Sequence, residues 1–543
     1  MAQEKMIGFL MNGIALSPDA EEKEACVIAA NEMRRAGENP ARLRFDIYKK
    51  SVDARKKDRV HLVYSVAIRS KNGDSLYLPS KCRYGMTPLY EREIATEKGT
   101  EKSPYSPLVV GMGPAGLFCA LLLAEQGYRP IIIDRGDSIA NRSLAHAKFV
   151  REGILDTESN IQFGAGGAGT YSDGKLLTRV NDPRVSYVLS RFCEFGAPQE
   201  ILTSAKPHIG TDRLVEVIDR MLLRIESLGG RVIYRCRLDG ISERADGSVV
   251  AKTTKGEILC SSLVLAPGHS ARDTYAMLMA NGYSVEAKPF SVGVRIEHLQ
   301  SEIDQALYGN FAGHPRIGKG EYHLSDTSSG RGVYTFCMCP GGQVVAAASE
   351  DGGVVVNGMS VYARDGKNAN SAVCVSVRPE DYGASPERAI AFQRNLERAA
   401  FRAGGSDYYA PMQTVGDFLE KRWGSEPSTV LPSYRDGRVR TSSLDEILPS
   451  FVTEELRHGL RSFDRKLSGF ACCEAILSGV ETRTSAPVRI LRNEEMRAVG
   501  HPNIYPCGEG AGYAGGITSA ALDGIRVAER LIARFMPNEN YFC

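Results

Sequence analysis

The sequence predicts an α/β protein with three parts: a parallel α/β domain, an inserted domain of mainly antiparallel strands, and a small N-terminal α+β domain. Strand-like and helix-like runs alternate from residue 108 to about residue 295, which is the order that a parallel sheet requires. Residues 330–375 are instead Gly-rich, with short strand-like runs. A charged segment with two prolines, 97–107, predicts a linker before the parallel part.

These changes in pattern define the expected domain boundaries. Because one domain usually holds ~100–200 residues, a chain of 543 residues is long enough for three. We expect the small domain at residues 1–103, the parallel domain at 104–290 and 470–543, and the inserted domain at 291–469.

The composition is that of a soluble globular protein. Charged residues make up 24% and hydrophobic residues 43% of the chain, and no stretch approaches the ~18 uninterrupted apolar residues of a spanning helix. A net charge of +2 is too small to attract a long polyanion such as a nucleic acid through the electrostatic field of the whole protein. The first residues lack the charge order of a signal peptide, and thirteen cysteines cannot all pair within one chain, so we expect a cytoplasmic protein.

The small domain contains the strongest local concentration of positive charge. We expect a strand from about residue 7, a helix over about 20–36 and a strand over 60–68. Between the helix and the second strand lies a basic segment, 44–59, which has seven basic and three acidic residues. This segment is either a face for an anionic partner such as RNA or a solvated run of charges.

The parallel domain opens with a dinucleotide-binding pattern. Strand residues 108–110 lead into a G-x-G-x-x-G turn at 111–116, a helix to about residue 126, and a second strand at 130–133 that ends in Asp134. A G-x-G-x-x-G sequence alone is often an ordinary turn. Here the strand, helix, second strand and terminal acid are all present around it, which predicts a Rossmann-like domain. By itself this unit does not distinguish NAD, NADP and FAD.

Each residue of the turn has a physical role in that interpretation. Gly111 allows the tight turn, Gly113 lets the backbone approach a pyrophosphate, and Gly116 lets the helix pack close to the strand. The helix N-terminus then faces the phosphates, and Asp134 accepts hydrogen bonds from a ribose hydroxyl.

Two distant segments favour FAD. The strand at 263–266 runs into Pro267-Gly268, and the strand at 504–507 runs into a Gly-Glu-Gly turn at 508–510, then Gly515-Gly516 and a helix. With the first turn they resemble the glutathione-reductase-like FAD-binding superfamily, in which the last turn contacts the flavin side. The superfamily commonly has Asp where this chain has Glu509.

A long glycine-rich loop, 159–175, exposes many backbone N–H groups suited to a pyrophosphate or a flavin ring. Together with the segments 334–342, 357–360, 370–372 and 479–485, it resembles the uncharacterised bacterial FAD-dependent dehydrogenase family. The likeness covers nearly the whole chain and implies an FAD cofactor. No flavin-linking His or Cys motif is apparent, so we expect the FAD to be bound noncovalently. The predicted cofactor-binding residues are Gly111, Gly113, Pro114, Ala115, Gly116, Asp134, Arg135, Gly166, Gly167, Gly169, Thr170, Ser172, Asp173, Gly174, Lys175, Ala266, Pro267, Gly268, Gly508, Glu509, Gly510, Gly515, Gly516 and Ile517.

Several other sites are not indicated. There is no second G-x-G-x-x-G for a nicotinamide cofactor, no C-x-x-C dithiol, and no metal-ligand spacing. Cys337 and Cys339 are expected to share one face of a strand, where two half-buried core residues are a commoner explanation than a chemical role.

The candidate catalytic residues are Lys175 and His208. A lysine at the end of the glycine-rich loop would stabilise negative charge on reduced flavin, and a histidine would move a proton near pH 7. The alternatives are a solvated lysine and a histidine bonded to a backbone carbonyl. Arg483 and Thr484 are expected on the substrate side, although an ordinary ion pair explains Arg483 equally well.

The leading functional hypothesis is therefore an FAD-dependent oxidoreductase that acts on a small organic substrate, with dissociable NADH or NADPH as its reductant. One alternative is a flavoprotein that binds RNA or a protein partner through the basic N-terminal domain. The other is a flavin-binding scaffold without catalysis.

Overall fold

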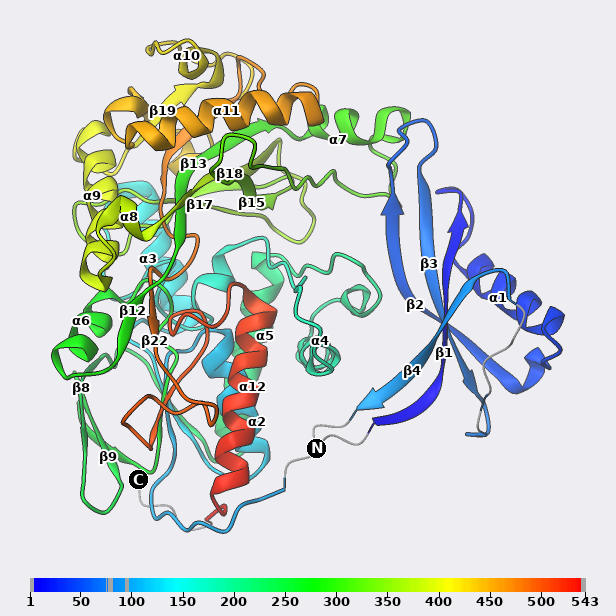
Figure 1. Ribbon diagram of the computed structural model, residues 1–543, viewed down its shortest axis with the longest axis horizontal. Helices are drawn as coiled ribbons and strands as arrows, with labels where there is room; N and C mark the ends of the chain where they lie inside the picture. The colour runs from blue at the N-terminus through cyan, green and yellow to red at the C-terminus, as the bar shows by residue number, and fades with distance from the viewer. Residues whose placement is uncertain (1–3, 75, 77–81, 93–96, 539–543) are drawn as a thin grey trace. The chain divides into compact units, whose positions relative to one another are not determined.

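The computed structural model describes residues 4–74, 76, 82–92 and 97–538, and Figure 1 labels its elements. The chain divides into two compact units. The smaller unit consists of Met1–Thr96, Arg179–His208 and Ser301–Gly320. The larger unit consists of Glu97–Thr178, Ile209–Gln300 and Glu321–Cys543.

The smaller unit is built on an antiparallel sheet with strand order β2-β3-β1-β4. One face of helix α1 covers it, because Ala25, Ala29 and Met33 recur every four residues and are buried against the strands. These elements are β1 (Glu4–Leu16), α1 (Lys23–Arg35), β2 (Leu43–Asp53), β3 (His61–Ser70) and β4 (Gly85–Arg92).

The later stretches join the smaller unit through specific contacts. The backbone N–H of Lys50 donates to the carbonyl of Thr203 at 2.7 Å, and the N–H of Ala205 donates to the carbonyl of Lys50 at 2.8 Å. The Arg316 guanidinium donates to the Tyr64 hydroxyl at 2.9 Å. Such long-range pairing has no local sequence signal. The elements of these stretches are α4 (Arg184–Glu194), η3 (Gln199–Leu202), α7 (Gln300–Tyr308) and η4 (Gly309–Phe311).

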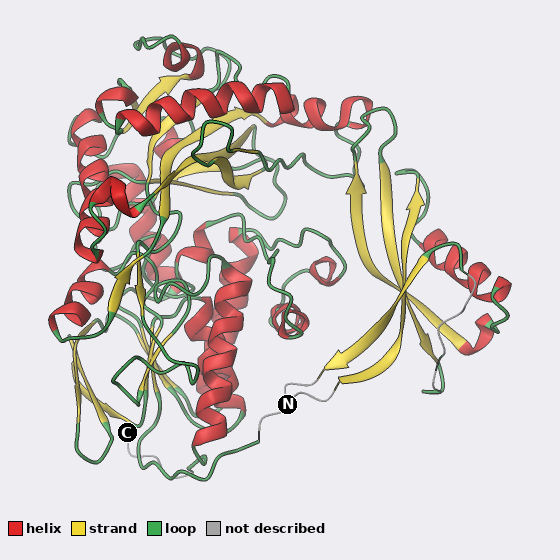
Figure 2. Ribbon diagram, in the orientation of Figure 1, coloured by secondary structure: helices red, strands yellow, loops and turns green. Residues whose placement is uncertain are grey.

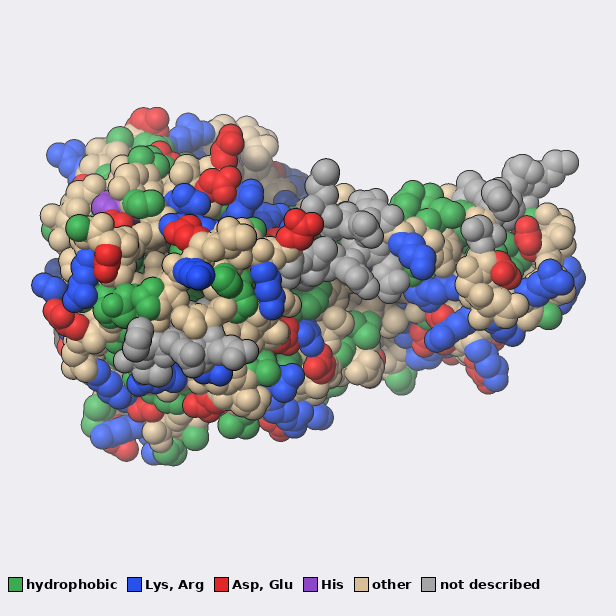
Figure 3. Space-filling view, turned by 90° about the horizontal axis from the view of Figure 1, so that it is seen from below, with side chains coloured by type: hydrophobic (Ala, Val, Ile, Leu, Met, Phe, Trp, Pro, Cys, Tyr) green, Lys and Arg blue, Asp and Glu red, His purple; other side chains and the backbone are tan. Residues whose placement is uncertain are grey.

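The acidic residues of the basic segment 44–59 pair with its own arginines. Arg44 contacts Asp46 at 2.8 Å and Arg55 contacts Asp53 at 2.6 Å. This pairing favours a solvated run of charges over a docking face. On the face of the larger unit that Figure 3 shows, Lys and Arg side chains are likewise interspersed with Asp and Glu.

The larger unit contains a five-stranded parallel sheet with order β23-β11-β5-β6-β7. Helix α2 packs against both α12 and α5 (Figure 1), and almost all of its residues are buried. The mixed α/β class predicted from the sequence is confirmed. The elements are β5 (Leu108–Val110), α2 (Pro114–Glu125), β6 (Ile131–Ile133), α5 (Thr211–Ser227), β7 (Arg231–Ile233), β11 (Leu263–Leu265), β23 (Ile504–Pro506) and α12 (Ile517–Arg534).

A seven-stranded sheet in the same unit has the order β14-β15-β18-β13-β21-β19-β20 and is antiparallel except for the β19/β20 pair. It extends past the expected boundary at residue 469, because β21 pairs with β13. Its strands are β13 (Phe290–Leu299), β14 (Ser325–Asp326), β15 (Val333–Cys339), β18 (Asn368–Val377), β19 (Ala410–Thr414), β20 (Val439–Thr441) and β21 (Ile476–Glu481).

Smaller sheets and further helices complete the larger unit (Figure 2). Among the described residues, no helix is long and apolar enough to cross a membrane. The remaining elements are α3 (Ile139–Glu152), η2 (Ala168–Tyr171), β8 (Leu238–Glu243), β9 (Val249–Thr253), β10 (Gly256–Cys260), α6 (Arg272–Ala280), β12 (Val285–Ala287), β16 (Gln343–Ala346), β17 (Val356–Met359), α8 (Pro379–Tyr382), α9 (Pro386–Ala403), α10 (Val415–Leu419), η5 (Tyr434–Asp436), η6 (Leu444–Glu446), α11 (Ser450–Lys466) and β22 (Val488–Ile490).

Candidate functional site

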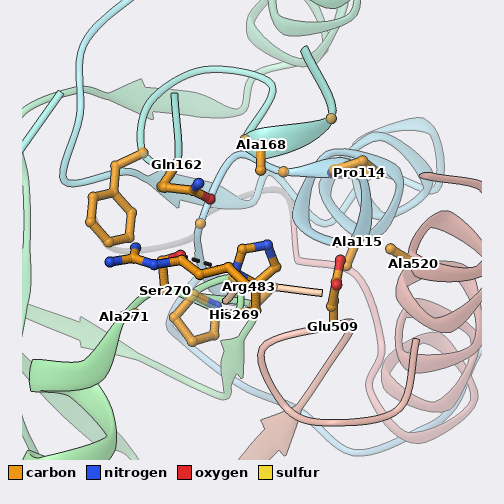
Figure 4. Close-up of a pocket in the computed structure, with 18 of the residues that line it drawn as sticks. Pro114, Ala115, Gln162, Ala168, His269, Ser270, Ala271, Arg483, Glu509 and Ala520 are labelled. Carbon is orange, nitrogen blue, oxygen red and sulfur yellow. Dashed lines mark hydrogen bonds between the residues drawn. The ribbon is translucent and has the colours of Figure 1, made fainter. Parts of the chain in front are cut away.

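A cavity of about 340 Å³ lies in the larger unit at the carboxyl ends of the parallel strands. Gly111 follows β5, Asp134 follows β6, Ala266 follows β11 and Cys507 follows β23, and all four residues line the cavity. This edge of an open parallel sheet is where α/β proteins bind their ligands. Figure 4 shows the side chains that converge there.

Most of the predicted cofactor-binding residues line this one cavity, although they come from four distant parts of the chain. The residues are Gly111, Gly113, Pro114, Ala115, Asp134, Arg135, Gly167, Gly169, Ser172, Asp173, Lys175, Ala266, Pro267, Gly268, Glu509, Gly515, Gly516 and Ile517.

The other predicted residues do not line the cavity, and close contacts within the protein require glycine at several of them. A Cβ on Gly166 would meet the Thr170 hydroxyl at 2.0 Å, and a Cβ on Gly508 would meet the Ala115 side chain at 2.6 Å. Those outside the lining are Gly116, Gly166, Thr170, Gly174, Gly508 and Gly510. His208 belongs to the smaller unit and does not line the cavity, so its catalytic role stays a prediction.

Helix α2 begins in very close contact with the sheet. A Cβ on Gly111 would lie 2.0 Å from the carbonyl oxygen of Ala266, and φ at Gly111 is 106°, in the region that favours glycine. A Cβ on Gly116 would lie 1.9 Å from the carbonyl oxygen of Gly111. Both glycines are therefore required by the packing of the protein itself.

Gly113 differs from its two neighbours. Its φ of −73° suits any residue, and the nearest atom to a Cβ there would be 3.9 Å away. The protein alone does not require glycine at this position, which lines the cavity at the start of α2. No side chain caps this helix, so its first N–H groups are available to an anion in the cavity.

A buried arginine that sequence reasoning missed holds the glycine-rich loop. Arg142 of α3 is fully buried and donates to the carbonyl groups of Asn160, Ile161, Ala165 and Gly167 at 2.6–2.9 Å. Burial lowers its pKa to about 10, so it remains charged at neutral pH. The guanidinium thus fixes the loop backbone beside the cavity.

The Asp134 side chain also holds backbone segments around the cavity in place. Its two carboxylate oxygens accept hydrogen bonds from the N–H groups of Met112, Gly136 and Gly164 at 2.8–2.9 Å. A carboxylate offers about four acceptor positions, so one is left for the predicted ribose contact.

Glu509 is a cavity residue whose pKa is strongly raised by its surroundings. Burial raises its pKa to about 7, against the opposing effect of Lys288. Among the residues that the structure describes, none donates a hydrogen bond to its carboxylate. Glu509 is thus placed to accept one from a ligand (Figure 4).

Lys175 faces the cavity from a cluster of charges. Its Nζ lies 3.5 Å from Glu321 and 4.0 Å from Asp173, and Arg364 also pairs with both acids. Burial opposes the charge on Lys175, but the two carboxylates outweigh it and raise the lysine pKa. The lysine is therefore a paired cation at the cavity rather than a solvated surface group.

His269 and Arg483 lie together in the cavity wall (Figure 4). Arg483 forms an ion pair with buried Glu397 at 3.0 Å and also lines the cavity, so the two explanations expected for this residue both apply. Burial and the nearby arginines lower the pKa of His269 to about 3, which keeps this histidine neutral. Nothing in the sequence distinguished His269 from an ordinary loop residue.

The seven-stranded sheet and its neighbours contribute the remaining wall: Phe336, Cys337, Asn357, Glu481 and Thr484. The lining position of Thr484 agrees with the prediction. Cys337 is half-buried as expected, but the prediction that it shares a face with Cys339 is wrong, because β15 bulges between Phe336 and Cys339 and only Cys337 of the two lines the cavity. No cluster of potential metal ligands occurs within the described ranges.

Residues 289–484 match the model of a family described as "FAD-dependent protein, C-terminal domain-like". An uncharacterized protein of Clostridium beijerinckii is 45% identical over 542 residues, covering 97% of this chain and 98% of its own length. The chain belongs to this FAD-dependent protein family. The matched region includes β13 to β21, so the family's domain supplies the wall that contains Cys337.

Three further proteins are similar to this chain at lower sequence identity. Protein FixC of Salmonella typhi is 28% identical over 244 residues, which is 42% of this chain and 54% of FixC. A glycine oxidase from Geobacillus kaustophilus is 12% identical, with 79% of this chain and 95% of the oxidase covered and a TM-score of 0.33. CtdE in complex with FAD is 12% identical, with 78% and 84% covered and a TM-score of 0.32.

We predict that Gly113→Val weakens FAD binding at least about tenfold, or about 1.4 kcal/mol, because the new side chain fills open space at the start of α2. The free energy of unfolding should fall by only about 1 kcal/mol, since no protein atom is displaced. Fluorescence titration with FAD and denaturant unfolding measure the two effects. Gly111→Val should disrupt folding, and exposed Gly85→Val should change neither; equal losses of folding and binding in Gly113→Val would contradict the assignment.

We predict that Glu509→Gln flattens the pH dependence of stability in cofactor-free protein. The raised pKa means that folded protein binds more protons than unfolded protein between about pH 4.5 and 7. The associated stability is present below this range and lost as pH rises through it, at about 1.4 kcal/mol per pKa unit. Urea unfolding across the range should show this loss in the parent and in exposed Glu454→Gln. A slope unchanged by Glu509→Gln would contradict the burial of its charge.

Proposed function

We propose that this protein is an FAD-dependent oxidoreductase that holds FAD noncovalently in the cavity and passes two electrons between FAD and a small organic substrate. The observation that carries the proposal is Gly113, whose missing side chain leaves open space at an uncapped helix N-terminus. Membership of the FAD-dependent family supports FAD over the other dinucleotides.

Two further features fit the cofactor. The Oε1 atom of Gln162 is buried with no hydrogen-bond partner among the described residues, and this side chain lines the cavity. The Glu509 carboxylate also lacks a donor within that part of the chain. A ligand with both hydroxyl groups and amide-like N–H groups, such as FAD, would satisfy both acceptors.

The residues divide between the two ends of the dinucleotide. The N-terminus of α2, with Gly111 and Gly113, would hold the pyrophosphate, and Asp134 would bind the adenosine ribose. Glu509 and the start of α12 at Gly516 would bind the flavin side, in keeping with the turn order of the glutathione-reductase-like superfamily. The bound flavin supplies two-electron redox chemistry.

The chain itself provides charge and proton control near that end. Lys175 presents a cation to the cavity, which favours negative charge on a bound ligand. With a pKa of about 7, Glu509 holds or releases a proton near neutral pH. His269 remains neutral and contacts the Ser270 hydroxyl at 2.9 Å, so it serves as a hydrogen-bonding group rather than a charge.

The experiment that tests this function has two stages. Purified protein should be yellow, and acid should release FAD into solution, because no covalent link is proposed. Anaerobic protein should then be reduced by NADH or NADPH and reoxidised by an added quinone or enoate. Colourless protein that gains no absorbance with FAD would contradict the cofactor, and yellow protein that no reductant can reduce would contradict the redox function.

We predict that Lys175→Met lowers the reduction potential of the bound flavin. Loss of the cation removes stabilisation of the reduced, negatively charged form and leaves Asp173 and Glu321 less compensated. A shift of about 30 mV corresponds to about 1.4 kcal/mol in a two-electron couple. Dye-coupled titration measures the midpoint, and exposed Lys148→Met serves as the control. An unchanged midpoint at full FAD occupancy would remove Lys175 from the flavin end of the cavity.

A further inference from the structure

Cys337 occupies an unusual position in the cavity wall. β15 pairs Phe336 with Ala372 and Cys339 with Asn370, so Cys337 and Met338 together oppose a single residue of β18. This extra residue is a β-bulge, a feature that is enriched beside functional sites. It breaks the alternation of the strand and allows the Cys337 side chain to line the cavity.

The backbone at Cys337 is also unusual. Its φ is 45°, in the left-handed region that favours glycine. A residue other than glycine in this region costs conformational energy, and such residues are concentrated at functional sites. The bulge would accept glycine without this cost, so the presence of cysteine points to a use for its thiol.

Cys339 supplies a second thiol directly behind the first. Its side chain is fully buried, and its Sγ lies 3.3 Å from the carbonyl oxygen of Cys337. The two cysteines are two positions apart, on either side of Met338, so both thiols belong to the same bulge of β15. Of these two cysteines, Cys337 lines the cavity and Cys339 does not, so the pair has one thiol that a ligand can reach and one that it cannot.

The surroundings shift the pKa values of the two thiols in opposite directions. The neighbouring Cys339 thiol lowers the pKa of Cys337 to about 7, and the cations Arg295 and Lys175 act in the same direction against burial. The Cys337 thiol and burial together raise the pKa of Cys339. Arg295 is held in place by Glu481 at 2.9 Å and donates to the Cys337 carbonyl at 3.2 Å. Near neutral pH, Cys337 is therefore partly ionised to the thiolate, and Cys339 remains a protonated thiol.

We propose that Cys337 and Cys339 are a redox-active pair, and that the substrate of this oxidoreductase is a thiol or a disulfide. The inference rests on the proposed function, because it assigns bound flavin as the electron partner. In the internal step, the Cys337 thiolate and the Cys339 thiol form one S–S bond. This bond formation releases two electrons and the Cys339 proton, and bound oxidised flavin would accept them, so atoms and charge balance.

The external step is thiol–disulfide exchange at Cys337. In the reducing direction, its thiolate attacks a substrate disulfide, forms a mixed disulfide and releases one substrate thiolate. Cys339 then attacks Cys337, forms the internal disulfide and releases the second substrate thiol. The buried position of Cys339 suits a resolving thiol, because it reaches Cys337 but not the substrate.

Peptide mapping tests the pair without relying on activity. Trypsin cleavage after Arg331 and Arg364 yields a peptide, 332–364, in which Cys337 and Cys339 are the only cysteines. Purified protein is treated with oxidised or reduced glutathione, denatured and alkylated. After oxidation the peptide should carry no alkyl group and lack two hydrogens, whereas after reduction it should carry two alkyl groups.

Anaerobic dithionite titration supplies the second readout. Oxidised wild-type protein should take up four electrons per FAD, two for flavin and two for the disulfide, and Cys337→Ser or Cys339→Ser should take up two. The matched control replaces the adjacent pair Cys472 and Cys473, which does not line the cavity, and should still take up four.

Each contrary outcome identifies what fails. Yellow protein that takes up two electrons and whose oxidised 332–364 peptide is fully alkylated overturns the cysteine pair but leaves the FAD proposal intact. A link from Cys337 to Cys374 would join two tryptic peptides and would overturn Cys339 as the partner. Colourless protein whose peptide still forms the disulfide would contradict bound FAD and, with it, the flavin step.

Discussion

The close approach of backbone to backbone around helix α2 is the constraint on which the site depends. Gly111 and Gly116 let this helix start against β11 and β5, and Gly524 lets α12 pack against it, since a Cβ on Gly524 would lie 2.0 Å from the Ala115 carbonyl. Together these contacts hold the uncapped end of α2 at the carboxyl edge of the sheet. The cavity, its open space at Gly113 and the proposed phosphate position all follow from that placement.

Charged side chains then fix the flexible parts around this rigid centre. Arg142 holds four carbonyl groups of the glycine-rich loop, and Asp134 collects N–H groups from three turns. Lys175, Asp173 and Arg364 form a separate cluster in which each charge has a partner. The site is therefore largely preformed. Two acceptors in the cavity, Gln162 Oε1 and the Glu509 carboxylate, have no donor among the residues that the structure describes, and a bound cofactor would satisfy them.

The parts of this site that were predictable from the sequence are local ones. A strand, a glycine turn and a helix follow one another in the chain, so Gly111, Gly113 and Asp134 were identified from spacing alone. The role of Arg142 was not predictable, because its partners are backbone carbonyl groups of a later loop and no sequence pattern connects them with this arginine. Strand alternation predicts that Cys337 and Cys339 share one face, and a bulge set by pairing with β18 overturns that expectation.

A crystal structure of the protein prepared with FAD would locate the cofactor directly. We expect the pyrophosphate at Gly113 and the N-terminus of α2, with the flavin ring at the end of the cavity that Glu509 and Cys337 line. Density for the flavin ring at the Asp134 end, or for FAD outside this cavity, would show that the site is assigned wrongly.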